Sequence, residues 1–161
     1  MEKKNYRIGI IVSDFNTEIT SSLLKGALDT LEKNGVPKEN IKTIHVPGAF
    51  ELPLAALHGI KHWNWQAAIC LGCVIRGGTP HFDYVAAEAA RGIMEVGLQT
   101  MVPTIFGVLT TDTYQQAQER SGLTPVYDDD YSKKRVVSHK GIASAETALQ
   151  MLENLKEENS L

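Results

Sequence analysis

The chain has 161 residues, of which 43% are hydrophobic and 22% are charged, and its formal net charge is −3. This length and composition predict one domain over residues 1–161 with a hydrophobic core, and they exclude disordered and fibrous proteins. The small negative charge and the lack of an apolar run of about 20 residues argue against a general nucleic-acid binder and against a membrane protein.

Strand-like and helix-like segments alternate along the first half of the chain. Residues 6–12 form a nearly continuous apolar run rich in isoleucine, as expected of a strand buried on both faces. No signal peptide precedes this run, so we expect a cytoplasmic protein. The following segments predict a helix that ends at Asn34-Gly35, a strand over residues 41–46, a helix over 51–63 and a strand over 67–71.

The second half of the chain continues this alternation. We expect a loop over residues 72–79, a helix over 80–98, a strand over 104–109, a short helix over 114–121 and a last helix over 139–157. Between the last two helices, residues 122–138 are irregular. This stretch carries Asp128-Asp-Asp130 and Lys133-Lys-Arg135, which suit a solvated loop or a subunit contact. The order predicts a flavodoxin-like α/β fold, a three-layer α/β/α sandwich around a four-stranded parallel sheet.

Unusual residues accompany the ends of all four expected strands. They are Phe15-Asn16, residues 48–51, residues 73–81 and Phe106-Gly107. In parallel sheets of this kind, ligands bind outside the carboxyl ends of the strands. We therefore expect these stretches to form the functional site.

The two cysteines and three of the histidines suit a structural role. Cys70 and Cys73 have the spacing of a redox pair or half a zinc site, but residues i and i+3 of a strand point to opposite faces. No second cysteine pair exists to complete a metal site. His58 and His62 could be two ligands on one helix, but without a third ligand surface or half-buried positions are favoured, and His45 suits the core. We therefore predict no bound metal.

The segment over residues 71–85 is the richest in chemical groups. Gly77 and Gly78 allow a positive φ or the close approach of a ligand to the backbone, and Thr79 followed by Pro80 suits the start of a helix. Free amides at a helix start suit a phosphate, and His81 in the first turn suits general acid–base chemistry. A plain strand–loop–helix connection with a packed histidine explains the same residues equally well.

Four stretches together resemble the signatures of lumazine synthases. They are Phe15-Asn16, Val46-Pro-Gly-Ala-Phe-Glu-Leu-Pro53, the pair Val74-Ile-Arg-Gly77 and Thr79-Pro-His-Phe-Asp-Tyr84, and Phe106-Gly-Val-Leu-Thr-Thr-Asp112. They follow the family's order, and the resemblance covers roughly residues 6–121 before it resumes at residues 139–141. A flavodoxin-like phosphosugar or nucleotide enzyme would rest on the fold and the glycine loop alone, and the first two stretches count against it.

The resemblance implies an enzyme of riboflavin biosynthesis. Lumazine synthases are transferases that condense 5-amino-6-(D-ribitylamino)uracil with 3,4-dihydroxy-2-butanone 4-phosphate to 6,7-dimethyl-8-ribityllumazine, and release phosphate and water. They use no metal and no organic cofactor. His81 would be the catalytic residue that shuttles protons, while most of the rate would come from positioning the two substrates.

The resemblance also implies which residues hold the pyrimidine and its ribityl chain. Phe15 would stack on the ring, with Asn16 beside it. Glu51 would accept hydrogen bonds from the ribityl hydroxyls, and it would also be placed to cap the helix that it opens. The rest of this pocket would be formed by Ala49, Phe50, Cys73, Val74 and Ile75.

The phosphate and the far side of the ring would be held by residues of two subunits. Gly78 and Thr79 would bind the phosphate, together with Arg120 of the adjacent subunit. Phe106 of that subunit would cover the ring, and Lys140 would face the pyrimidine. We therefore expect a homo-oligomer with shared active sites.

The chain departs from the family pattern in two places. Residues 123–138 form an insertion where the family has a short link, which affects the placement of Lys140. Ala143 stands where the family usually has an acidic residue that orients the histidine, and Glu146 lies nearly a turn away on the helix. These departures favour an alternative, a catalytically weak paralogue that binds the ribityl pyrimidine or a flavin. His139, where the family often has asparagine, has no assigned role.

The family's ring is a pentamer, and some relatives stack twelve pentamers into a hollow shell. The insertion falls in a link that must turn tightly where pentamers meet in the shell, and the arm ahead of Tyr6 is short. Both features predict a free pentamer or a decamer.

Overall fold

Four parallel strands form the central sheet of the computed structural model, which describes residues 5–127, 134–135 and 137–157. The sheet has the order β2-β1-β3-β4, which is the flavodoxin-like order. Its strands are β1 (Ile8–Ser13), β2 (Ile41–Val46), β3 (Ala67–Ile75) and β4 (Thr104–Thr111). The predicted four-stranded parallel sheet is confirmed.

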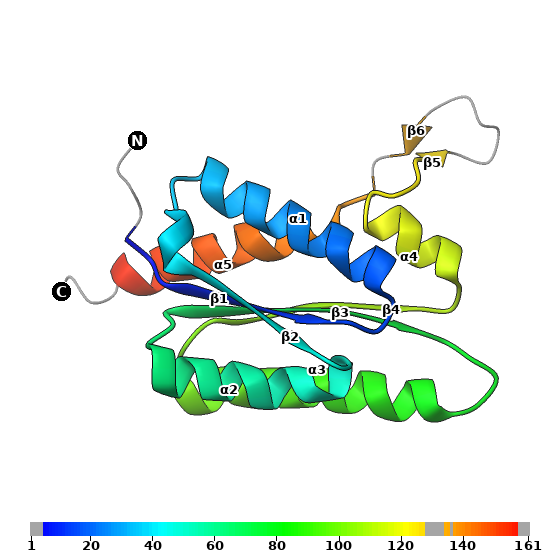
Figure 1. The fold of residues 1–161 in the computed structure, drawn as a ribbon, viewed down its shortest axis with the longest axis horizontal. Helices are drawn as coiled ribbons and strands as arrows, with labels where there is room; N and C mark the ends of the chain where they lie inside the picture. Colours follow the sequence, from blue (N-terminus) through cyan, green and yellow to red (C-terminus); the bar gives the residue numbers. More distant parts are fainter. Residues whose placement is uncertain (1–4, 128–133, 136, 158–161) are drawn as a thin grey trace.

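Helices cover both faces of this sheet and complete the predicted three layers (Figure 1). On one face lie α1 (Thr17–Lys33), α4 (Tyr114–Arg120) and α5 (Lys140–Glu157). On the other lie α2 (Leu52–Trp63) and α3 (His81–Thr100). Two short 3-10 turns, η1 (Lys38–Asn40) and η2 (Ala49–Glu51), flank β2.

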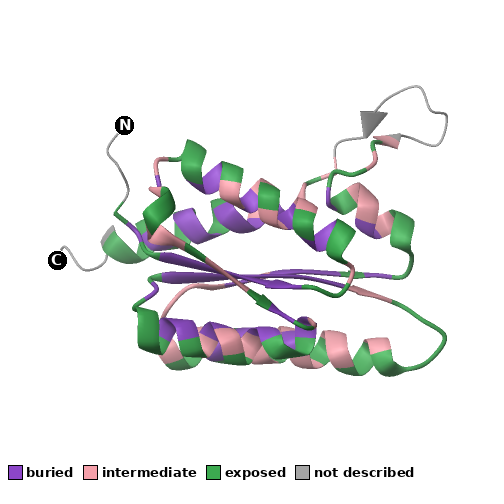
Figure 2. Ribbon diagram, viewed as in Figure 1, coloured by how far each residue is buried: buried purple, intermediate pink, exposed green. Residues whose placement is uncertain are grey.

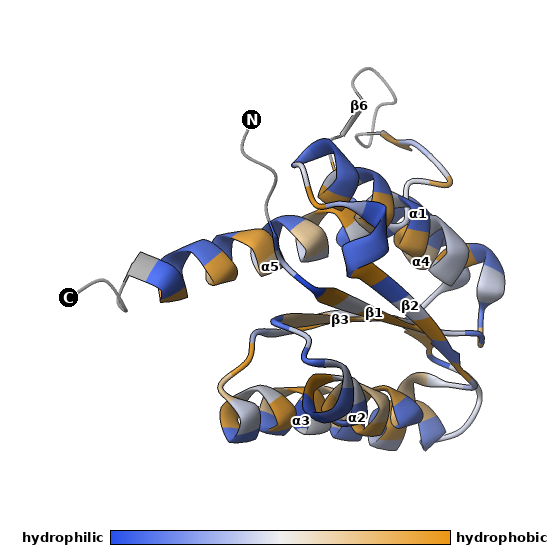
Figure 3. Cartoon of the chain, turned by 60° about the vertical axis from the view of Figure 1, so that its left-hand side comes forward, coloured by the Kyte–Doolittle hydropathy of each residue, from blue (hydrophilic) through white to orange (hydrophobic). Residues whose placement is uncertain are grey.

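The central strands explain why the elements assemble in this way. Every residue of β1 is buried, and Figure 2 shows the burial concentrated along the sheet. Alternate side chains of β1 enter different cores: Ile10 packs on the α1 and α5 side, and Ile11 on the α2 and α3 side. Figure 3 shows hydrophobic residues along the central strands, while the helices carry both hydrophobic and hydrophilic residues. Burial of such apolar area, at about 25 cal/mol per Å², is the main stabilising term of the fold.

Two strands are longer than their sequence suggested. The predicted loop over residues 72–79 is wrong in its first part, because β3 continues to Ile75 and pairs with β4 as far as Thr111. Cys73 is buried within this extension. Phe106 and Gly107 consequently lie inside β4 rather than at its carboxyl end. The glycine at position 72 misled the prediction, although its backbone still takes part in the ladder opposite Val108.

The two cysteines lie on opposite faces of the sheet, as predicted. Cys70 belongs to the core on the α2 and α3 side, and Cys73 to the core on the α1 and α5 side. Both are free, and burial raises the pKa of each thiol to about 12. Both therefore stay protonated near neutral pH, which fits small core side chains.

The insertion is not wholly irregular, in contrast to the prediction. Two short strands, β5 (Val126–Tyr127) and β6 (Lys134–Arg135), pair antiparallel within it. The acidic run at 128–130 and the first basic residue at 133, expected in a solvated loop or a subunit contact, lie outside the described residues.

His139, which directly precedes α5, caps the first turn of that helix. Its Nδ1 accepts hydrogen bonds from the amides of Gly141 (3.2 Å) and Ile142 (3.4 Å). The ring is wedged between α1 and the end of α4, because a Cβ added at Gly26 or Gly122 would lie 2.5 or 2.7 Å from it. A neutral imidazole can accept these bonds, whereas a protonated one cannot and would also oppose the helix dipole.

We predict that His139 makes stability depend on pH. Burial lowers the pKa of His139 from its ordinary 6.5. A histidine whose pKa is lower in the folded chain contributes its full stability above pH 6.5, and this is lost as the pH falls through 6.5 toward the lowered value. The free energy of unfolding, measured with denaturant at pH 8 and pH 5.5, should fall more in the parent than in His139→Asn, which retains a capping oxygen but does not titrate. The same pH dependence in both proteins would contradict this assignment.

Candidate functional site

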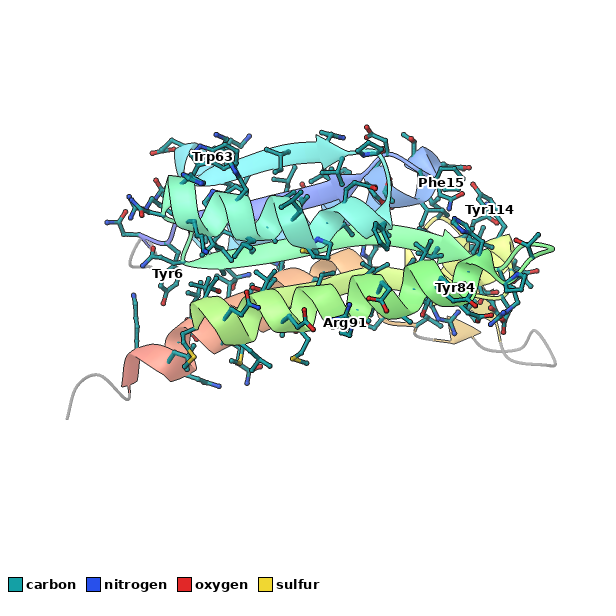
Figure 4. The ribbon with its side chains drawn as sticks, turned by 90° about the horizontal axis from the view of Figure 1, so that it is seen from below. Tyr6, Phe15, Trp63, Tyr84, Arg91 and Tyr114 are labelled. Carbon is teal, nitrogen blue, oxygen red and sulfur yellow. The ribbon has the colours of Figure 1, made fainter. Side chains whose placement is uncertain are left out.

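A cavity of about 740 Å³ opens at the carboxyl edge of the sheet, where the sequence placed the site. Four connections form it: the turns after β1 and β2, the end of β3 with its following loop, and the start of α3. Figure 4 shows two of its aromatic residues, Phe15 and Tyr84, at this end of the molecule. Its lining residues are Phe15, Gly48, Ala49, Phe50, Glu51, Cys73, Val74, Ile75, Gly77, Thr79, His81, Phe82, Tyr84 and Val85.

The turn after β1 presents an aromatic ring to the cavity. Asn16 has a left-handed backbone conformation (φ 60°), and its Nδ2 donates a hydrogen bond to the Cys73 carbonyl at 2.9 Å. Asparagine tolerates this conformation better than most residues because its side chain bonds locally. The neighbouring Phe15 is 71% exposed. Asn16 thus ties this turn to β3 and holds Phe15 at the rim, but it does not line the cavity itself.

The turn after β2 supplies a second aromatic ring and a carboxylate. Oε2 of Glu51 accepts a hydrogen bond from the Gly48 amide at 3.0 Å and so caps the 3-10 turn η2, whereas its side chain makes no capping hydrogen bond to α2, the helix that it was expected to cap. Ala49 is buried beneath this turn, whereas Phe50 is 59% exposed. Large apolar faces left in water within a concave site favour an occupant with a flat apolar surface.

The wall of the cavity comes from the extended end of β3. Cys73 is buried, and Val74 and Ile75 are half-buried. Because its thiol stays protonated, Cys73 contributes shape to this wall and is unsuited to act as a thiolate nucleophile.

The loop between β3 and α3 leaves backbone open to the cavity. A Cβ added at Gly77 or Gly78 would meet no atom within 4 Å. The described glycines with positive φ are Gly35 and Gly122, so Gly77 and Gly78 are not required for an unusual backbone conformation. Two roles were expected for these glycines, a positive φ and the close approach of a ligand to the backbone. Only the second is consistent with the structure.

The start of α3 differs by one residue from the expected cap. Pro80 occupies the N-cap position and the helix begins at His81, so the prediction that Thr79 caps with Pro80 in the first turn is wrong. Because proline has no side-chain acceptor, the amides of the first turn have no side-chain cap there. These amides and the Thr79 side chain lie beside the glycine loop, an arrangement that suits an anion.

His81 is exposed in the first turn of α3 and lines the cavity. Tyr84 and Val85 follow it by three and four residues, on the same face of the helix. The helical period from His81 was the signal that could have identified them. The lining residues Phe82, Tyr84 and Val85 lie outside the stretches expected to form the site, whereas Gly48 and Gly77 lie within them.

Five residues predicted for the site lie outside the cavity lining of this chain. They are Asn16, Gly78, Phe106, Arg120 and Lys140. Gly78 is in the adjoining loop. Phe106 is half-buried in β4, Arg120 ends α4 and donates a hydrogen bond to the Gln116 carbonyl, and Lys140 begins α5.

Phe106 lines a second hollow, of about 450 Å³, between α3, β4 and α5. This hollow is apolar, and its rim carries exposed side chains of Met94, Leu98 and Met101. Such an exposed apolar patch is typical of a protein–protein contact.

Three further histidines lie on the surface. His58 and His62 are exposed on α2 with their rings 4.4 Å apart, as favoured from the sequence. The expected core position of His45 is wrong, because β2 is an edge strand and His45 is exposed there, with its Nδ1 2.7 Å from Asp14 Oδ1. Among the described residues, no three histidine, cysteine or acidic side chains are grouped to hold a metal ion. In that same part of the chain, no helix has the length and hydropathy to cross a membrane.

Comparison with known proteins agrees with the four sequence signatures. The family model described as 6,7-dimethyl-8-ribityllumazine synthase matches residues 5–156. A protein of that name from Protochlamydia amoebophila (strain UWE25) is 46% identical over 147 residues, which are 91% of this chain and 78% of the relative. The chain belongs to the 6,7-dimethyl-8-ribityllumazine synthase family.

Proposed function

We propose that the protein condenses 5-amino-6-(D-ribitylamino)uracil with 3,4-dihydroxy-2-butanone 4-phosphate to 6,7-dimethyl-8-ribityllumazine, and releases phosphate and water. It would act as a transferase of riboflavin biosynthesis in the cytoplasm. The observation that carries the proposal is one cavity with exposed aromatic rings at one side and an open glycine loop with a helix start at the other. The first suits a flat pyrimidine and the second a phosphate.

On the pyrimidine side, Phe15 stacks on the ring and Glu51 accepts hydrogen bonds from the ribityl hydroxyls. One Glu51 oxygen, Oε2, already accepts the Gly48 amide, which fixes the carboxylate and leaves the other oxygen for a ligand. Cys73, Val74 and Ile75 form the apolar wall against the ring. This apolar wall would orient the pyrimidine without the help of a charged side chain.

On the phosphate side, Gly78 and Thr79 bind the phosphate through the loop and the amides that begin α3. His81, which follows directly, is placed to exchange protons with the second substrate. Imine formation, loss of phosphate, tautomerisation and ring closure each move a proton, and none needs a nucleophile from the protein. Holding the two substrates together therefore supplies much of the rate, and His81 adds general acid–base catalysis.

The reaction itself is the direct test of the proposal. The purified protein, mixed with both substrates, should form the lumazine chromophore. Because the family resemblance implies chemistry without a metal, a chelator should leave the rate unchanged. Absorbance measured with and without the chelator checks both statements. Binding of the pyrimidine without turnover would reject catalysis, and a rate lost with the chelator and restored by a divalent ion would reject the metal-free route.

Replacement of His81 tests the proton transfer. His81→Ala should lower kcat by about 10- to 1,000-fold with little change in pyrimidine affinity, because general acid–base help is of this size. The acidic position of the family is Ala143 here, so His81 would act without the carboxylate that the family places there. His62→Ala removes an exposed histidine from α2 and should keep full activity. A full rate in His81→Ala would reassign the proton transfer.

The active site is proposed to be shared within a homopentamer, or in two such rings as a decamer. Phe106, Arg120 and Lys140 lie outside the cavity of their own chain, as suits residues that act on a neighbour's substrate. The apolar hollow that holds Phe106, with exposed Met94 and Met101, supports a subunit contact there. A head-to-tail contact generates a ring where its rotation closes, and the ring that the family resemblance implies is a pentamer.

The mass of the particle in solution tests this assembly. Light scattering of the full chain should give a mass of about five or ten chains, because rings of head-to-tail contacts have closed symmetry. A megadalton particle would reject the free ring in favour of a shell. An active monomer would reject the shared site altogether.

A further inference from the structure

We propose that Arg76 is a positioning residue that holds the β3–α3 loop and the first turn of α3 in place for the phosphate-bearing substrate. Its guanidinium contacts Asp112, which follows β4, and Asp83 in α3, so Arg76 connects the end of β3 to both of these elements. This inference rests on the proposed function for the identity of the substrate, but its structural part can be tested without any turnover.

The contacts of Arg76 extend to both sides of the loop. Its backbone amide donates to the Thr111 carbonyl at 2.9 Å, which fixes the residue at the end of the sheet. Nε donates to Asp112 Oδ1 at 2.9 Å, and Nη1 lies 3.2 Å from Asp83 Oδ1 in the first turn of α3. The guanidinium carbon lies 4.3 Å from the centre of the Phe82 ring. One side chain thus connects β3, the end of β4 and α3.

The loop that Arg76 closes has little support of its own. All residues from 76 to 81 are exposed, and Gly77 and Gly78 have open space on their side-chain side. Gly77, Thr79 and His81 nevertheless line the cavity. Their placement therefore depends on the two ends of the loop, and the Arg76 side chain ties these ends together. A displacement of about 1 Å at a reacting group can cost about 100-fold in rate.

The geometry requires arginine rather than a general positive charge. A planar guanidinium can donate to two carboxylates and stack on a ring at the same time, whereas a lysine ammonium is a point charge. The side chain is 44% exposed and its partners are more so. Exposed ion pairs contribute little to global stability, so removal of Arg76 should loosen the loop without unfolding the protein.

Arg91, on α3, offers a matched control. It is also exposed, and it pairs with two acidic residues, Glu88 and Glu95. It is absent from the cavity lining, and Figure 4 shows it along α3, away from the end that carries Phe15 and Tyr84. Arg91→Met therefore removes an equivalent pair of ion contacts without touching the loop.

The experiment compares Arg76→Met, Arg76→Lys and Arg91→Met by amide hydrogen exchange and by kinetics. In Arg76→Met, exchange of the hydrogen-bonded amides of residue 76 and Asp83, at the two ends of the loop, should accelerate by about 10-fold or more, because loosely held loops open more often. KM for the phosphate-bearing substrate should rise by about 5- to 10-fold, while KM for the pyrimidine changes by less than about twofold, because the loop bears on one substrate only. Arg76→Lys should fall between Arg76→Met and the parent, and Arg91→Met should match the parent. Arg76→Lys keeps the test available if Arg76→Met does not fold.

A further variant separates positioning from direct binding. Asp112→Asn removes an anchor of the guanidinium, so under positioning it should raise the same KM and weaken the binding of inorganic phosphate. If Arg76 instead bound phosphate directly, its release from Asp112 would tighten that binding and overturn the proposal. Exchange in Arg76→Met equal to that of the parent would also overturn it. If the parent makes no lumazine but exchange is still faster in Arg76→Met than in the parent, the positioning role is supported and the proposed function is rejected.

Discussion

Parallel pairing of the buried strand β1 with β2 on one side and β3 on the other is the constraint on which the rest of the structure depends. A strand buried on both faces can only be satisfied by a ladder on each edge and a helical layer above and below it. Parallel strands bring all their carboxyl ends to one edge. The connections that follow β1, β2 and β3 must therefore meet there, and their meeting place is the cavity.

Small polar contacts then convert this edge into a shaped site. The Asn16 amide donates to the Cys73 carbonyl, which joins the turn after β1 to the end of β3. The Glu51 carboxylate accepts the Gly48 amide and fixes the turn after β2. The Arg76 guanidinium links the loop after β3 to α3. Each of these contacts connects backbone that apolar packing leaves free, so the rings and the loop are held in place before a ligand arrives.

The errors of the sequence-based prediction share a physical origin. Gly72 suggested that β3 ends at residue 71, although residues 73–75 beyond it are apolar; the Gly72 backbone pairs opposite Val108, and β4 continues the ladder up to Thr111. His45 was placed in the core by its position in a strand, yet β2 is at the edge of the sheet and leaves it exposed. A hydrophobic pattern describes one strand at a time, whereas the length of a strand and the exposure of its residues depend on the neighbouring strands.

The sequence by itself determined the order and type of the main elements, the three layers, the opposite faces of Cys70 and Cys73, and three of the four stretches expected at the site, which contribute residues to the cavity lining. It did so because apolar periodicity and terminal residues act locally. Only the tertiary structure decided that β3 extends to Ile75, that His45 is exposed at the edge of the sheet, and that Phe106, Arg120 and Lys140 lie away from the cavity. These outcomes depend on contacts between segments far apart in the chain, which no local pattern records.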